Sequence, residues 1–234
     1  MKFVLKHCGK GDLARRIRHV QFGKIKGMST RAGNAVFVDD LVKSGTDAAA
    51  EIIRTSPTIK ISEDEIEAAA LQLALSALSF GDMKERRSHD YRFSWRRALE
   101  TRGDSGALLH HTHARLCSLL SAAEPEWHQR LHKDNGEEKI ITNNVLVEPE
   151  ALALLEHLNE LQGALKDSFS QLEPCILVQY LLKLCRLTGR ARSTLYVKNQ
   201  PISVGFPRLM LFSTTKDVLA FGMRLIGLEP IDRI

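Results

Sequence analysis

The sequence is poor in aromatic residues and cysteine, and it lacks long apolar runs. Phe, Trp and Tyr make up 6% of the 234 residues. The cysteines Cys8, Cys117, Cys175 and Cys185 include no CxxC pair, which argues against a disulfide framework or zinc knuckle and favours a reducing compartment. No apolar run is long enough to span a membrane. Residues 2–16 contain neither the apolar core of a signal peptide nor a serine-rich transit pattern.

What the sequence does contain is typical of a helical globular protein. Hydrophobic residues account for 44% and charged residues for 26%, and leucine and alanine are abundant, which favours helices packed through aliphatic side chains. The net charge is +5 and the pI is near 9.1. An acidic partner, most commonly nucleic acid, is therefore plausible. The alternative is a solvated basic surface, and the distribution of charge must decide between them.

The first part of the chain changes character near residue 46. Residues 1–45 are basic, contain glycine and have short apolar runs, which predicts the edge of an α/β structure. Beyond them the apolar spacing becomes helical. Ser62 and Glu65 form an S-x-x-E capping box, in which each side chain satisfies a free backbone N–H of the other residue.

The second half of the chain predicts a helical bundle. Leucines recur on one broad face of residues 105–122, and Asp104 or Ser105 is the expected N-cap of that helix. Further helices are predicted from prolines that suit a first turn, namely Pro149, Pro174 and Pro207, and the last of them ends at Gly227 and Pro230. Between them, the polar stretch 124–147 contains the turn pair Asn135-Gly136 and predicts a loop.

Positive charge is concentrated in one predicted helix. No acidic residue occurs between Pro174 and Val204, and Lys183, Arg186 and Arg190 share one helix face at i, i+3 and i+7. A stripe of one sign suits a phosphate backbone, whereas an ordinary solvated face usually mixes both signs. We favour the polyanion interpretation.

A second basic cluster, residues 84–102, contains the alternating aromatics Tyr91, Phe93 and Trp95. These side chains could stack on bases. Packing in the core is the preferred interpretation, because alternating aromatics beside a helix usually anchor it.

Two histidine pairs have spacings that can ligate a metal from one helix face, and both are rejected. His110 and His113 are at i, i+3, and His128 and His132 are at i, i+4. Neither pair has the adjacent acid of an H-E-x-x-H motif, and no cysteine pair completes a tetrahedron. We expect no metal site and no tightly bound cofactor.

Three sequence blocks, in order, carry a family resemblance. The glycine-punctuated basic loop "FGKIKGMSTRAG" (22–33) precedes the apolar run "AVFV" and predicts a mobile loop leading into a strand or a buried segment. Its "GMSTRAG" resembles the class I signature loop of arginyl-tRNA synthetases. Residues 81–119 resemble that family's passage from the catalytic to the anticodon-binding domain, and residues 208–234 resemble its C-terminal helices. Overall the chain looks most like the mitochondrial form.

The resemblance implies a mainly α fold. Residues 1–104 would be the C-terminal remnant of a class I α/β catalytic domain, and residues 105–234 an all-α, DALR-type anticodon-binding bundle. The implied activity is arginine–tRNA ligase, in which ATP activates arginine before its transfer to tRNA. The implied setting is a monomer in the mitochondrial matrix, with the cytoplasm as the alternative and no membrane association.

Site residues follow from the same resemblance. The loop would close over ATP, a substrate accompanied by Mg²⁺, and stabilise the departing pyrophosphate. The expected catalytic residues are Lys26, Met28, Ser29, Thr30 and Arg31. Contacts to the ATP phosphates are expected from Lys24, Gly27, Ser29 and Gly33. The expected tRNA-binding residues are Lys183, Arg186, Arg190, Arg192 and Arg115.

The sequence also departs from the family pattern. Gly27 stands where the class signature has a lysine, which Lys26 or a lysine elsewhere in a longer enzyme would replace. His110-His111 stands where Gln-Tyr is usual, Arg96 replaces an acid, and Ile234 replaces a methionine. No His-x-Gly-His-type motif occurs. We therefore expect a C-terminal portion that binds tRNA weakly and catalyses nothing alone. The alternatives are a non-catalytic tRNA-binding short isoform and a helical domain that binds an acidic protein.

Overall fold

The computed structural model describes residues 1–26, 37–56, 62–100, 103–133 and 146–233, with the backbone alone for 124–133. In chain order the helices are α1 (Lys2–His7), α2 (Gly11–Arg16), α3 (Val38–Thr55), α4 (Glu63–Lys84), α5 (Trp95–Ala98), α6 (Gly106–Lys133), α8 (Pro149–Asn159), α9 (Leu161–Gln171), α10 (Pro174–Thr194) and α11 (Ile202–Leu225). Within these ranges, β structure is limited to an isolated parallel bridge between Ile25 and Tyr91. The predicted mainly α fold is confirmed.

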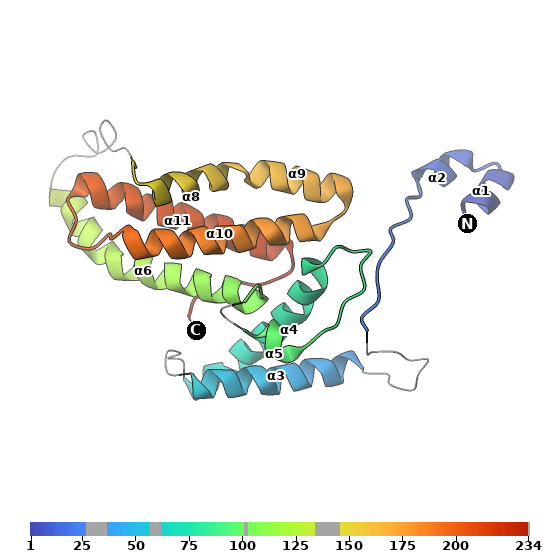
Figure 1. Cartoon of the computed structure of the whole chain (residues 1–234), viewed down its shortest axis with the longest axis horizontal. Coiled ribbons are helices and arrows are strands. Elements are labelled where there is room, and N and C mark those ends of the chain that lie inside the picture. The colour runs from blue at the N-terminus through green and yellow to red at the C-terminus, as the bar shows by residue number, and fades with distance from the viewer. Residues whose placement is uncertain (27–36, 57–61, 101–102, 134–145, 234) are drawn as a thin grey trace.

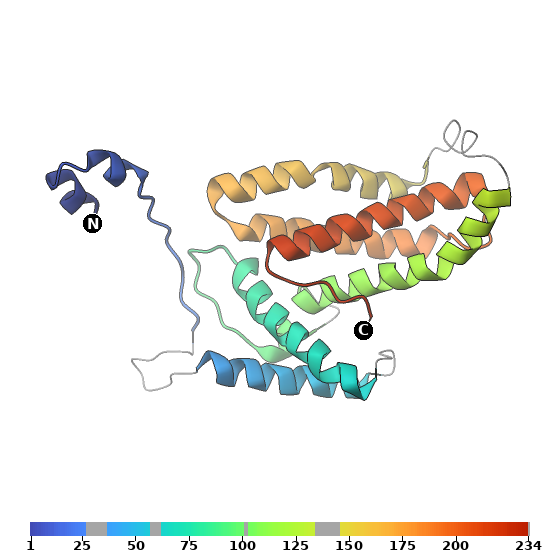
Figure 2. The same cartoon turned by 180° about the vertical axis from the view of Figure 1, so that it is seen from behind.

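The helices form three groups in space. α6, α8, α9, α10 and α11 make up the large bundle (Figure 1), and α4 leads from it to α3, which packs along one side of α4. α1 and α2 stand away from this body at the end of an extended segment, as both views show (Figure 2). The tail after α11 returns beneath the bundle towards the start of α6.

α10 is the centre of the bundle, because it packs against α4, α6, α8, α9 and α11. Leu181, Leu182 and Leu184 are completely buried, and Phe212 of α11 joins the same cluster. Each such leucine contributes about 1.5–3 kcal/mol relative to an exposed position. The leucine periodicity that predicted these helices therefore marks the faces that form the core.

A second hydrophobic cluster lies between α3 and α4. It is built mainly from small side chains such as Ala49, Ala70 and Ala77, which allow the two helices to approach closely. Trp95 covers this cluster next to Gly45, where an added Cβ would lie 2.1 Å from the indole ring. The rings of Phe93 and Trp95 meet edge to face with their centroids 4.8 Å apart. Both side chains therefore pack against the protein, in agreement with the interpretation that was preferred over stacking on bases.

Several helix ends follow the predicted chemistry. Ser62 and Glu65 form the capping box at the start of α4. The Ser105 hydroxyl accepts the Leu108 N–H at 3.2 Å, which caps α6. Pro149 and Pro174 occupy first turns. Gly227 follows α11 with φ +76°, a left-handed conformation that glycine adopts at no steric cost.

Two helix boundaries differ from the prediction. α6 continues to Lys133 through Pro125, so the expected loop at 124–147 was wrong for its first ten residues. α11 begins at Ile202 and holds Pro207 inside it, although proline was expected at its start. In both places the proline removes only one backbone hydrogen bond. For α11, packing of side chains such as Leu211 and Phe212 outweighs that loss.

The N-terminal part also differs. Its described residues form the helices α1, α2 and α3 and an extended segment, 17–25, whose β structure is limited to the Ile25–Tyr91 bridge, so the expected α/β edge is reduced to that bridge. Phe37 and Val38, which end the apolar run "AVFV", are each 71% exposed at the start of α3, so the expected strand or buried segment was wrong there. A run of apolar residues does not by itself determine burial, because burial also requires another part of the structure to pack against those side chains. Among the described residues, no helix is both long and apolar enough to cross a membrane.

Candidate nucleic-acid interface

The base of the predicted signature loop pairs with residues 87–91. The Lys26 N–H donates to the Tyr91 carbonyl at 2.7 Å, and the Tyr91 N–H donates to the Lys24 carbonyl at 3.1 Å. Gly23 passes so close to the chain that an added Cβ would lie 2.0 Å from the His89 carbonyl oxygen, so only glycine fits there. The segment that leads into the loop is thus fixed to the basic aromatic segment that follows α4.

Asp90 engages both lysines at this base. Its carboxylate accepts the Lys24 backbone N–H at 2.9 Å and lies 3.7 Å from the Lys26 ammonium. The Lys24 hydrogen bond, and then the charge of Lys26, lower the pKa of Asp90. Lys26 therefore has a carboxylate partner here. The other predicted loop residues, Gly27, Met28, Ser29, Thr30, Arg31 and Gly33, lie outside the described residues.

Arg87 joins this segment to the bundle. Its guanidinium donates to the Gln21 carbonyl at 2.9 Å and to the Glu173 carboxylate at 3.3 Å, and its backbone N–H donates to the same carboxylate at 3.1 Å. Arg87 also accepts the Gly23 N–H through its carbonyl. Glu173 precedes α10, so one half-buried ion pair links the base of the loop to the bundle.

We expect Glu173→Ala to loosen the base of the loop. Removing a charged hydrogen-bond acceptor costs about 1.5–3 kcal/mol, so amide exchange at Gly23 and Lys26 should accelerate by about tenfold or more. Hydrogen exchange followed by mass spectrometry measures this. Glu229→Ala is the matched control, because Glu229 pairs with the exposed Arg224 alone among the described groups. Equal exchange rates in the two variants would contradict the role of Glu173.

Acidic residues from other elements reach the basic stripe of α10. Lys183 lies 3.1 Å from Glu160, and Arg186 lies 2.9 Å from Asp104. Arg190 is exposed and has no side-chain partner within the described part of the chain. The basic stripe contains only cations along the sequence, but in the folded chain acidic residues from other elements pair with Lys183 and Arg186. Arg190 is therefore the cation of the stripe that is most available to a ligand.

A second group of cations lies between α6 and α10. Arg115 and Arg192, which were predicted separately, come close enough to affect each other and His111. Burial and then Arg115 lower the pKa of Arg192, and burial followed by Arg115 and Arg192 lowers that of His111. The Nε of Arg192 is buried and has no hydrogen-bond partner among the described atoms. Two guanidiniums with no acid beside them in the described part of the chain form a site that a phosphate can occupy.

His111 was noted in the sequence only as a departure from the family pattern and was not among the predicted tRNA-binding residues. Its i, i+4 spacing to Arg115 would have placed both side chains on one face of α6. His110 and His113, whose spacing was rejected as a metal-binding pair, have different partners. His110 is completely buried against the Ser76 hydroxyl at 2.8 Å, whereas His113 faces the C-terminal tail. The side chains of His128 and His132 lie outside the described residues.

A groove of about 1010 Å³ runs between α6, α11 and the C-terminal tail. Its cations include Lys216, Arg224 and Arg233, and its apolar lining includes Leu209 and Met210. Asp217 and Asp232 also line the groove, and Lys216 lies 3.2 Å from Asp217, so its charges are mixed in sign. The bundle thus has two separate features, a cluster of cations between α6 and α10 and an open groove between α6, α11 and the tail.

Comparison with known proteins defines the class. Residues 109–234 match the DALR anticodon binding domain, and residues 3–95 match the catalytic domain of class I tRNA synthetases (R). This pairing defines a class I tRNA synthetase carrying an anticodon-binding bundle. The chain belongs to the arginyl-tRNA synthetase family.

Relatives from several organisms share this assignment. The mitochondrial arginine–tRNA ligase of Saccharomyces cerevisiae is 34% identical over 225 residues, covering 95% of this chain and 34% of the yeast protein. The probable mitochondrial arginine–tRNA ligase of Mus musculus is 36% identical, covering 95% of this chain and 37% of its own length. The cytoplasmic arginine–tRNA ligase of the same yeast is 31% identical, covering 99% and 37%. The chain therefore spans about a third of these relatives.

A solved structure supports the fold. The arginyl-tRNA synthetase of Thermus thermophilus superimposes with a TM-score of 0.79 at 24% identity, covering all of this chain and 38% of that protein. At this identity the likeness concerns the fold alone.

Proposed function

We propose that this chain is the tRNA-binding part of an arginine–tRNA ligase, which uses ATP to charge tRNA with arginine. Family membership supports the activity, and the neighbouring cations Arg115 and Arg192, which no described acid neutralises, carry the proposal for tRNA. ATP, with Mg²⁺, would meet the loop that follows Lys24 and Lys26. The mitochondrial relatives favour the mitochondrial matrix, with the cytoplasm as the alternative. The whole enzyme is proposed to act as a monomer.

The proposed division at residues 104 and 105 assigns the N-terminal part to the catalytic domain. Large apolar side chains are unusually exposed there: Phe3 is 72% and Phe22 is 84% exposed. α1 and α2 also stand away from the body (Figure 1). Such side chains normally lie against other parts of a domain. This exposure supports a role for residues 1–26 as one side of a larger catalytic domain.

The cations of the bundle would bind tRNA with unequal strength. Arg115 and Arg192 have no acidic partner among the described side chains, so a phosphate would not have to displace one of these. Arg190 would contribute as a solvated charge. Lys183 and Arg186 would contribute less, because Glu160 and Asp104 already neutralise them.

The test is binding of tRNA to the purified chain over a series of salt concentrations. We expect the double variant Arg115→Gln/Arg192→Gln to weaken binding by about tenfold or more and to reduce the slope of log K against log salt by about 1–2, because each phosphate contact releases counterions. The matched control, Lys43→Gln/Arg54→Gln, removes the same charge from α3. Fluorescence anisotropy with arginine-accepting tRNA measures both.

A second readout separates phosphate contact from a general charge effect. A phosphate between Arg115 and Arg192 should raise the pKa of His111 towards its ordinary value, which NMR of the ring protons follows. Equal weakening by the two double variants would contradict the assigned interface. Salt-independent binding, or no preference for arginine-accepting tRNA, would instead favour the helical domain that binds an acidic protein. Weak tRNA binding without arginine-dependent ATP–pyrophosphate exchange is the result expected of this chain alone.

A further inference from the structure

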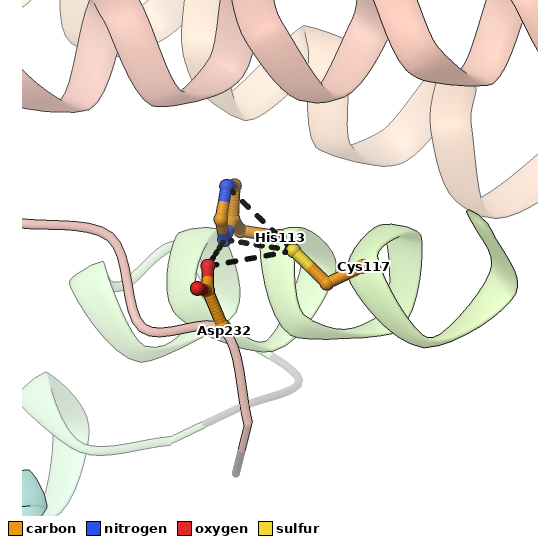
Figure 3. A group of neighbouring side chains, drawn as sticks. All are labelled: His113, Cys117 and Asp232. Atoms are coloured by element: carbon orange, nitrogen blue, oxygen red, sulfur yellow. Dashed lines mark hydrogen bonds and ion pairs between the residues drawn. The ribbon is translucent and has the colours of Figure 1, made fainter. Parts of the chain in front are cut away.

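Three side chains that can ligate a metal meet beside the groove between α6 and α11. His113 and Cys117 lie one turn apart on α6, and Asp232 approaches them from the C-terminal tail (Figure 3). His113 Nδ1 lies 3.7 Å from Cys117 Sγ and 3.7 Å from Asp232 Oδ1, and Sγ lies 3.6 Å from Oδ1. The three atoms thus form a nearly equilateral triangle.

This triangle has the dimensions of a zinc site. With Zn–S near 2.3 Å and Zn–N or Zn–O near 2.0–2.1 Å, tetrahedral ligands lie about 3.3–3.6 Å from one another. Nitrogen, sulfur and carboxylate oxygen are also the donor types that zinc accepts. We propose that His113, Cys117 and Asp232 bind Zn²⁺ or a similar borderline-soft divalent cation, independently of the proposed tRNA contacts.

Two groups can supply the fourth ligand. The site opens on the groove, so water can reach it. The Ile231 carbonyl oxygen also lies 3.1 Å from His113 Nδ1, close enough to approach the same ion. Three protein ligands with an open fourth position resemble the geometry of an accessible rather than a closed structural site.

The position of Asp232 is determined by packing, although its side chain is 80% exposed. Ile226 and Leu228 belong to the bundle core, and Ile231 packs against the cluster between α3 and α4. The tail is therefore anchored by Ile226, Leu228 and Ile231, which precede Asp232. The Asp232 carboxylate thus has a more defined position than a carboxylate on an unanchored terminus.

Metal binding requires two proton changes. Burial and then Asp232 raise the pKa of Cys117 to about 11, so the metal-free sulfur is a thiol, and its proton passes to solvent when the metal–sulfur bond forms. His113 Nδ1 donates to the Ile231 carbonyl without metal. On binding, its proton moves to Nε2 through solvent, and Nδ1 offers its lone pair. No oxidation or reduction occurs.

The ion would fasten the C-terminal tail to α6. Asp232 and Arg233 line the groove together with Cys117. A bound ion would therefore fix one wall of the groove and add positive charge to it. The chain could then present a more rigid surface to a ligand without any change in the bundle core.

The test is titration of the reduced chain with Co²⁺, a spectroscopic substitute for Zn²⁺. We expect a thiolate-to-Co²⁺ charge-transfer band that saturates near one equivalent and is abolished by equimolar Zn²⁺. Cys117→Ser should lose the band, and the matched control Cys8→Ser, which alters an exposed cysteine, should retain it. Asp232→Asn, an exposed substitution that leaves the core intact, should weaken Co²⁺ binding by about tenfold or more.

A second measurement does not depend on the thiolate. Zn²⁺ should slow amide exchange at residues 231–233 in the wild-type chain and leave it unchanged in Asp232→Asn. The proposal is overturned if the wild-type chain shows no band, or if Cys117→Ser keeps it. Either result would leave the cluster as a hydrogen-bonded contact and would not affect the tRNA-binding test.

Discussion

Replacing Gly222 with valine is expected to lower the free energy of unfolding by about 2–3 kcal/mol. Gly222 of α11 faces α10, and an added Cβ would lie 2.5 Å from Leu181 Cδ2. Leu181 is completely buried, so it cannot turn aside without displacing its neighbours. The branched side chain must therefore separate the two helices or force unfavourable rotamers, because the interior is closely packed.

Urea denaturation followed by circular dichroism measures this loss. Gly189→Ala is the matched control, because Gly189 lies in α10 and an added Cβ would meet no atom within 4 Å. There the substitution should raise the free energy of unfolding by about 0.5–1 kcal/mol, since alanine loses less backbone entropy in a helix. Stabilisation by both substitutions would mean that α10 and α11 have room at Gly222.

The second large effect concerns His110 and pH. Burial, and then the charge of His113, lower the pKa of His110 to about 4. The unfolded chain takes up this proton near its ordinary pKa of about 6.5, whereas the folded chain stays neutral until about 4. The stability contribution is thus present above about pH 6.5 and is lost as the pH falls towards 4, by up to about 3 kcal/mol.

His110→Gln is expected to remove most of this loss. Glutamine has no proton to take up, and its amide can still meet the Ser76 hydroxyl. Urea denaturation at a series of pH values from 7 to about 4 compares the slopes of the two proteins. His19→Gln, at an exposed position, is the control and should keep the wild-type slope. If His110→Gln keeps it too, the titration of another group accounts for the pH dependence.

The sequence predicted the helices because their information is local. Leucine spacing along α10 and the capping chemistry at Ser62 and Ser105 act within one or two turns. The ion pairs of the basic stripe were not predictable in this way. Arg186 meets Asp104 across 82 residues of sequence, and Glu160 reaches Lys183 from the junction between α8 and α9. A charge count within one helix cannot include such partners.

The composition of the candidate sites could not be predicted either, because it also depends on contacts between residues distant in the sequence. Arg115 and Arg192 were predicted as separate contacts, and their mutual approach depends on how α6 packs against α10. Asp232 could not be joined to His113 and Cys117 before the path of the tail was known. Residue types were therefore recoverable from the sequence, whereas their combination required the packing of distant helices.

α4 connects the two hydrophobic clusters of the molecule, although the two family matches describe separate regions of the chain. Its first turns, with Ile66 and Ala70, belong to the cluster with α3, while Phe80 near its end belongs to the bundle core. A single uninterrupted helix of 22 residues thus contributes to both hydrophobic clusters. Neither cluster can lose its packing without weakening the other, so we expect the α3–α4 pair and the bundle to unfold together.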